Sequence, residues 1–201
     1  MVAEQRGLMT RGIVLLSLLL AGCPPKEPAS QYMSGPGPGH ADMTCPASTE
    51  AVGLAPPNGL ETYCARTDIR GDREKHGPYM RWHDSATLDI QGNYYVDKPH
   101  GAWQEFYTNG RPKLIGHYTE GDPDGPWAEY YDGGQMTKQG TMTNGRASGH
   151  WQYWTESGVL EREGTFNDGE MDGIWVYYRL DGEPRIRRTY RFGRLISQTE
   201  L

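Results

Sequence analysis

The pattern of apolar and polar residues repeats every 24 residues from Gly77 onward. Rows of that length align without a gap, and each row begins with glycine and carries aromatic residues two and five positions later. Two short alternating segments in each row, bounded by glycine-containing turns, are typical of β-strands. A period of this length indicates stacked structural units. We therefore predict five repeats over residues 77–196, with two strands in each and a C-terminal tail of residues 197–201. The rows begin at Gly77, Gly101, Gly125, Gly149 and Gly173.

The residues between the two strands of a repeat predict how the strands pair. Counting the first glycine of a repeat as position 0, pairs such as Asn109-Gly110 follow the first strand. Such pairs accept the two positive φ angles of a type I′ turn. A turn centred there places position 2 opposite position 15, so that Trp103 faces Gly116 and its indole covers that glycine. Position 5 has the opposite parity, so its aromatic side chains are expected on the other face of the sheet.

Composition narrows the fold class. Only 14 residues in the stretch 77–201 are Val, Ile or Leu, whereas glycine makes up 27 of the 201 residues of the chain. No segment beyond the first 23 residues has a helical period. The prediction is an all-β protein, an elongated antiparallel meander of repeated β-hairpins with about ten strands. So few aliphatic residues cannot fill a core between two packed sheets, so the aromatic rows are expected to bury surface between neighbouring repeats.

A recurrent motif joins one repeat to the next. Gly116-His-Tyr118-Thr-Glu-Gly121-Asp-Pro-Asp-Gly125 returns in related form from Gly140 and from Gly164. This motif resembles the MORN repeat, in the variant found in bacterial MORN-like proteins. Tryptophan stands where that family often has a second glycine, and Met142 replaces an aromatic residue. The resemblance implies a curved single sheet that binds partners and has no catalysis of its own, and it names no partner.

The segment before the repeats contains two of the three cysteines. Cys45 and Cys64 are an even pair in a chain that we expect to be exported, which predicts a disulfide worth about 3 kcal/mol for a loop of this length. Metal binding is the alternative, but no C-x-x-C spacing favours it. We interpret residues 45–76 as a disulfide-closed N-terminal cap with a divergent half-repeat.

The first residues have the pattern of an export signal. Two arginines precede a short apolar run that ends in Leu20-Ala21-Gly22-Cys23, and the run is too short to span a bilayer. These four residues resemble the lipobox of bacterial lipoproteins. The resemblance implies a signal peptide of residues 1–22, cleavage before Cys23, and lipid on its sulfur and amine, including an acyl chain such as palmitate. Residues 23–44 are rich in proline and glycine and are expected to be a tether. Pro24 in place of aspartate favours the outer over the inner membrane.

Motif searches argue against an enzyme. The sequence lacks G-x-S-x-G, a P-loop, H-E-x-x-H and a dinucleotide fingerprint, and its six histidines are scattered. We expect no catalytic residue, no cofactor and no metal site; acidic turns at Glu120 and Asp168 are read as solvated, with weak calcium binding as the alternative. The net charge of −6 argues against a nucleic-acid partner.

Two groups of residues are candidates for binding. Arg185, Arg187 and Arg191 share one strand parity, and they either protect a sheet edge or form a patch for anionic head groups or an acidic partner. Trp127 and Trp151 represent the tryptophan row, which is either core or a surface that stacks on sugars or grips a protein.

Together these features predict a lipid-anchored scaffold of the bacterial envelope, periplasmic or surface-facing, that engages a protein or an envelope glycan. The alternative is an immunity or antitoxin-type protein that neutralises a toxin, because bacterial MORN-like proteins resemble families so described.

Overall fold

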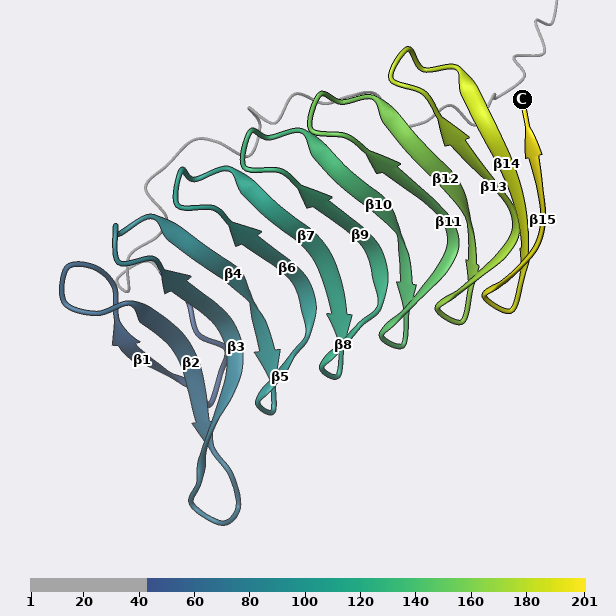
Figure 1. Cartoon of the computed structure of the whole chain (residues 1–201). Coiled ribbons are helices and arrows are strands. Elements are labelled where there is room, and N and C mark those ends of the chain that lie inside the picture. The colour runs from purple at the N-terminus through teal and green to yellow at the C-terminus, as the bar shows by residue number, and fades with distance from the viewer. Residues whose placement is uncertain (1–42) are drawn as a thin grey trace, which may run out of the picture. The chain divides into compact units, whose positions relative to one another are not determined.

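The computed structural model describes residues 43–201. The predicted signal peptide, the lipid-bearing Cys23 and nearly all of the tether lie outside the described residues. Within them, 15 strands form one antiparallel sheet in which the longer strands pair in sequence order (Figure 1). The all-β meander predicted from the sequence is confirmed.

The strand count exceeds the expected ten because of short and flanking strands. The five repeats supply two long strands each. The other five are β1 and β2 before the repeats, the two-residue strands β5 and β8, and β15 after them. The strands are β1 (Glu50–Leu54), β2 (Glu61–Thr67), β3 (Arg73–Trp82), β4 (Leu88–Tyr95), β5 (Lys98–Pro99), β6 (Gly101–Phe106), β7 (Pro112–Thr119), β8 (Asp122–Pro123), β9 (Gly125–Tyr130), β10 (Met136–Thr143), β11 (Arg146–Trp154), β12 (Leu160–Asn167), β13 (Glu170–Tyr178), β14 (Pro184–Arg191) and β15 (Arg194–Glu200).

Pairing within each repeat follows the predicted register. Trp103 on β6 faces Gly116 on β7, and the same pairing joins positions 2 and 15 in the next two repeats. The turn type, however, is different from the prediction. In the loop after β6 only Gly110 has a positive φ, and the amide of Gly110 bonds to the carbonyl oxygen of Tyr107. A three-residue loop with one left-handed glycine produces this geometry, together with the irregular register beside Phe106.

The type I′ geometry is found in the turns at the opposite ends of the strands. Glu120-Gly121 has φ angles of 52° and 99°, and Asn144-Gly145 has 48° and 78°. These turns join one repeat to the next, and Asp168-Gly169 follows the same pattern. A non-glycine residue accepts positive φ there because the two-residue connection matches the twist of the strands that it joins.

The tryptophans at position 2 form the core, with exposures of 8% or less. Their indoles do not cover the glycine opposite them in the same hairpin, as we had expected. Trp127 lies instead over Gly116 of the preceding repeat, and Trp151 lies over Gly140. A Cβ atom at either glycine would overlap the ring, so position 15 is glycine because the next repeat lays an indole on it.

Aromatic residues at position 17 fill the space between consecutive tryptophans, except in the third repeat, where the residue is Met142. Tyr118 makes edge-to-face contacts with Trp103 and Trp127 at ring-centroid distances of 5.5 and 5.6 Å. Phe166 does the same between Trp151 and Trp175 at 6.0 and 5.0 Å. This geometry is favourable for aromatic pairs. Stacked rings therefore supply the burial that aliphatic residues supply in a two-layer protein.

Side chains at position 6 tie the hairpin ends of neighbouring repeats together. The Tyr107 hydroxyl donates to the carbonyl oxygen of Tyr130 at 2.7 Å, and the Tyr131 hydroxyl donates to that of Trp154 at 3.2 Å. Each bond crosses from one repeat to the next, so it stabilises the stack rather than a single hairpin.

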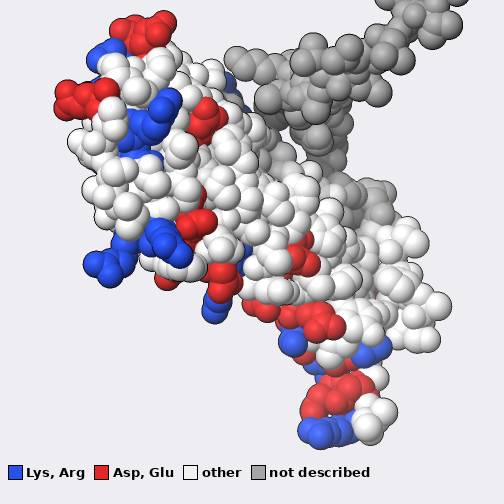
Figure 2. Space-filling model, turned by 90° about the vertical axis from the view of Figure 1, so that its right-hand side faces the viewer, with Lys and Arg blue, Asp and Glu red and all other residues white. Residues whose placement is uncertain are grey.

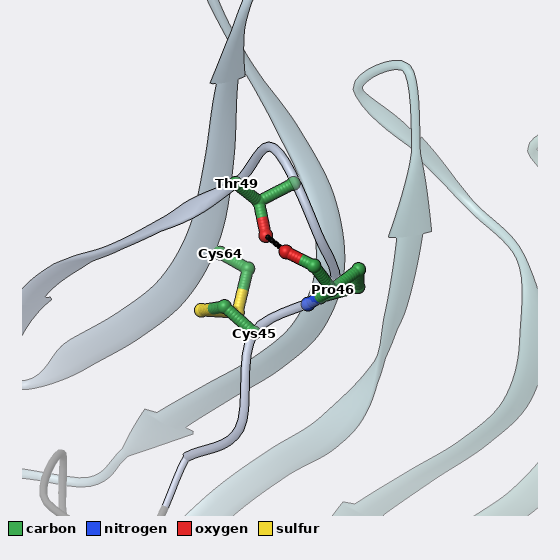
Figure 3. Close-up of a disulfide and its surroundings, with 4 residues drawn as sticks. All are labelled: Cys45, Pro46, Thr49 and Cys64. Atoms are coloured by element: carbon green, nitrogen blue, oxygen red, sulfur yellow. Dashed lines mark hydrogen bonds between the residues drawn. A yellow bond between two sulfur atoms is a disulfide. The ribbon is translucent and has the colours of Figure 1, made fainter.

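The N-terminal segment is fastened to the sheet by the predicted disulfide. Cys45 is joined to Cys64 on β2, with Cα atoms 5.5 Å apart (Figure 3). Cys64 is fully buried, and beside it the Thr49 hydroxyl donates to the carbonyl oxygen of Pro46 at 2.6 Å. The disulfide holds the segment before β1 against β2, the strand that precedes the first repeat.

Candidate functional site

The sheet has two chemically different faces. We call the face that carries the position 2 residues the tryptophan face. The opposite face is identified by Gln152, which lies between Trp151 and Tyr153 in β11 and therefore points the other way. Gln152 donates to Glu163 at 2.9 Å and accepts from Gln139 at 3.0 Å. We call this second face the amide face.

The amide face carries a row of aromatic residues at position 5 of the second to fifth repeats, which we call the outer aromatic row; Trp82 at this position of the first repeat is buried. Trp154 and Tyr178 are half-buried, as are the other two members, and the Tyr178 hydroxyl donates to Glu163 at 2.6 Å. Burial and this carboxylate raise the pKa of Tyr178 to about 12. The row confirms that both faces carry aromatic residues, and successive members are about 9.6 Å apart because each repeat adds two strands. Its members are Phe106, Tyr130, Trp154 and Tyr178.

Apolar partners extend the outer aromatic row into a stripe. Across each hairpin, Tyr130 faces Met136 and Trp154 faces Leu160. These partners are also half-buried. The stripe runs across the repeats near the hairpin loops, with no second layer of the described residues packed upon it.

The candidate residues Trp127 and Trp151 lie in the core of the tryptophan face. Their side chains are 8% and 3% exposed, and each covers a glycine of the preceding repeat. This placement favours the core interpretation over the binding interpretation for both.

The candidate residues Arg185, Arg187 and Arg191 all lie on β14. The edge-protection interpretation is wrong for them, because β15 pairs along the outer side of β14. Arg185 also has no register partner on β13, where a bulge separates the pairs on either side, so simple alternation does not hold there. Figure 2 views the side on which β15 lies and shows basic side chains interspersed with acidic ones.

Sequence reasoning missed two arginines on the tryptophan face. The Arg162 guanidinium carbon lies 4.4 Å from the centre of the Tyr153 ring, and that of Arg188 lies 4.7 Å from the centre of the Tyr177 ring. Hydrogen bonds with Tyr177 and Tyr190 raise the pKa of Arg188. Both pairs have the distance of cation–π contacts. The signal in the sequence was the replacement of glutamate by tyrosine at position 4 in the last two repeats.

Two further features concern residues 43–201. No group of three or more His, Cys, Asp and Glu side chains in this part of the chain is arranged to hold a metal ion. No helix there is long and apolar enough to cross a membrane.

Comparison with known families agrees with the repeat geometry. The model of the MORN repeat variant matches residues 99–120 and residues 147–168. Each match begins at the end of one repeat and spans both strands of the next repeat and the loop between them. The chain carries MORN-like repeats. No curated protein matches the sequence.

Among solved structures, the crystal structure of a GtfA/B complex bound to UDP and GlcNAc is similar over 76% of this chain, at 12% identity and a TM-score of 0.19. The chain spans 26% of the length of that protein. A similarity of this size carries no argument about function.

Proposed function

We propose that this protein is a binding scaffold of the bacterial envelope, held at the membrane by lipid on Cys23 and presenting its MORN-like sheet to a macromolecular partner, without catalysis of its own. The outer membrane is the proposed location. The lipobox-like Leu20-Ala21-Gly22-Cys23 supports the anchor. Two or more acyl chains hold a protein stably at a membrane, whereas one holds it only marginally.

The observation that carries the scaffold proposal is the outer aromatic row. Its aromatic side chains recur once per repeat from the second repeat onward and remain half-buried, although the core on the tryptophan face is complete without them. Aromatic side chains that keep one surface accessible dominate binding hot spots. A row that repeats along the sheet in this way fits an extended surface of a large partner better than a small molecule, which prefers a single concave site.

The anchor is tested by labelling cells with a fatty acid that carries a reactive tag. We expect the wild-type chain to incorporate the tag and Cys23→Ala to lose it entirely. The double variant Cys45→Ala, Cys64→Ala is the matched control, because it removes the other cysteines and should keep the label. Tag on Cys23→Ala would overturn the lipid anchor.

The binding surface is tested by crosslinking in the native envelope, followed by capture of the protein and mass spectrometry. We expect one partner to be captured by the wild type and by Thr165→Ala, an exposed position on the amide face that pairs with His150, four residues before Trp154 on β11. Trp154→Ala should lose that partner while retaining its fold by circular dichroism. Equal capture by all three proteins would remove the outer aromatic row from the binding surface.

A further inference from the structure

The tryptophan face changes its electrostatic character along the sheet. In the third repeat, Lys138 at position 13 pairs with the carboxylate of Glu129 at position 4, with Nζ and Oε1 3.0 Å apart. In the fourth repeat, Arg162 occupies position 13 and Tyr153 occupies position 4. The same place in the sheet therefore holds a neutralised cation in one repeat and a cation without its carboxylate in the next.

Arg162 has a donor that the protein leaves unused. Its Nε is buried and has no hydrogen-bond partner, although its guanidinium lies over the Tyr153 ring. Buried donors without acceptors are uncommon in native proteins and call for a specific explanation. An acceptor supplied by a ligand is such an explanation.

Arg188 lies on β14, two strands further along the sheet from Arg162 on β12. Arg162 pairs in register with Tyr177 across the boundary between repeats, and Arg188 lies over the ring of that same tyrosine. The Nε of Arg188 donates to Gln198 at 2.8 Å. Within residues 43–201, neither guanidinium lies within salt-bridge distance of a carboxylate. Each of the two arginines therefore lies over a different tyrosine ring, Arg162 over Tyr153 and Arg188 over Tyr177, without an acidic partner among the described residues.

We propose that Arg162 and Arg188 form an anion site that binds carboxylates of an acidic peptide segment in a partner protein. The planar fork of a guanidinium matches a carboxylate in two parallel hydrogen bonds. The Lys138–Glu129 pair is the chain's own example of a carboxylate at the equivalent place. Aromatic walls strengthen the attraction because they exclude water from around the charges. This surface is on the opposite face from the outer aromatic row, so the two proposals stand independently.

The chain offers a control of equal charge. Arg185 and Arg187 lie on β14, the same strand as Arg188, and both are exposed. The described residues give them no ring contact and no hydrogen bond from their side chains. Exchanging either pair of arginines for glutamine removes two positive charges from the same end of the protein, but only one exchange removes the aromatic-backed site.

The test measures binding of oligoglutamate to the purified full chain by calorimetry, with oligoglutamine as the neutral probe. We expect Arg162→Gln with Arg188→Gln to weaken binding about tenfold or more, as loss of a charged hydrogen bond does. Arg185→Gln with Arg187→Gln should change it by less than about threefold, because exposed charges contribute little. Arg162→Lys keeps the charge but not the fork and should also weaken binding, which keeps the test decisive if Arg162→Gln fails to fold.

Four results would overturn the proposal. Equal losses in the two double variants would show general attraction between charges, and full binding by Arg162→Lys would remove the role of the guanidinium fork. Absence of oligoglutamate binding to the wild type would remove the site. Binding to inorganic phosphate or to vesicles of anionic phospholipid, with none to oligoglutamate, would assign the two arginines to a phosphate ligand instead. None of these results bears on the lipid anchor or the outer aromatic row.

Discussion

The second and third repeats bury their tryptophans differently from the fourth and fifth. Trp127 turns its six-membered ring toward the glycine beneath it and donates its indole N–H to Glu129 at 2.9 Å. Trp175 places its ring junction over the glycine and donates to the backbone carbonyl of Thr165 at 3.1 Å. Trp103 follows the first arrangement, and Trp151 follows the second.

The residue two places after each tryptophan decides between these arrangements. A buried indole N–H needs an acceptor. Glu105 and Glu129 provide a carboxylate acceptor in the earlier repeats. Tyr153 and Tyr177 have no carboxylate to offer at the same position. The later indoles turn to a backbone carbonyl, next to an irregular register between repeats. The comparison teaches that one repeat position can serve as core in two ways, and that its neighbour selects which.

Strand continuity differs between the same two regions. Pro99 and Pro123 occupy position 22 in the earlier repeats, where the first strand is interrupted before β6 and β9. Ala147 and Met171 occupy that position later, where β11 and β13 continue without a break. Proline has no N–H to donate to the ladder, so its presence accounts for the interruption.

The largest expected effect is the loss of a core ring from either region. Trp103→Ala and Trp175→Ala should each lower the free energy of unfolding by about 3–5 kcal/mol, as other buried aromatic truncations do. Urea denaturation of both variants measures this. A loss below about 1 kcal/mol in only one of them would show that the two arrangements do not contribute equally to the core.

A smaller effect is expected from the glycine beneath the ring. Gly164→Ala should cost about 1–3 kcal/mol, because its Cβ would overlap the Trp175 indole. Arg188→Ala at the same repeat position should cost about 1 kcal/mol or less, because it removes only the contacts with Tyr177 and Gln198 and no tryptophan follows it. Thermal melting compares the two variants. Equal losses would mean that glycine serves strand geometry there and not the ring of the next repeat.

The smallest effect tests the selecting residue. Glu129→Leu should cost about 1 kcal/mol by leaving the Trp127 N–H without its acceptor and Lys138 without its carboxylate partner. Glu161→Leu, an exposed carboxylate on β12, is the control and should be neutral. The fluorescence of the variants reports the indole environment, and unchanged emission with unchanged stability in Glu129→Leu would show that the carboxylate does not select the ring orientation.

The sequence by itself determined the 24-residue period, the all-β meander, the pairing of Trp103 with Gly116 and the pairing of Cys45 with Cys64. These follow from alternation, glycine placement and cysteine count, which are local properties of the chain. The sequence also pointed to both aromatic rows, since positions 2 and 5 differ in parity along a single strand.

Only the tertiary structure decided where each indole lies, because its direction depends on the offset between neighbouring repeats. Placement over Gly116 brings Trp127 against a strand of another hairpin, which pairing within one repeat cannot specify. The tertiary structure also decided the surroundings of Arg185 and Arg187, because β15 pairs along the outer side of their strand. Arg162 and Arg188 come from two repeats, and each lies over the tyrosine of its own repeat, Tyr153 or Tyr177. Local sequence patterns determine the register within a hairpin, whereas contacts between hairpins determine which side chains are buried and which remain on the surface.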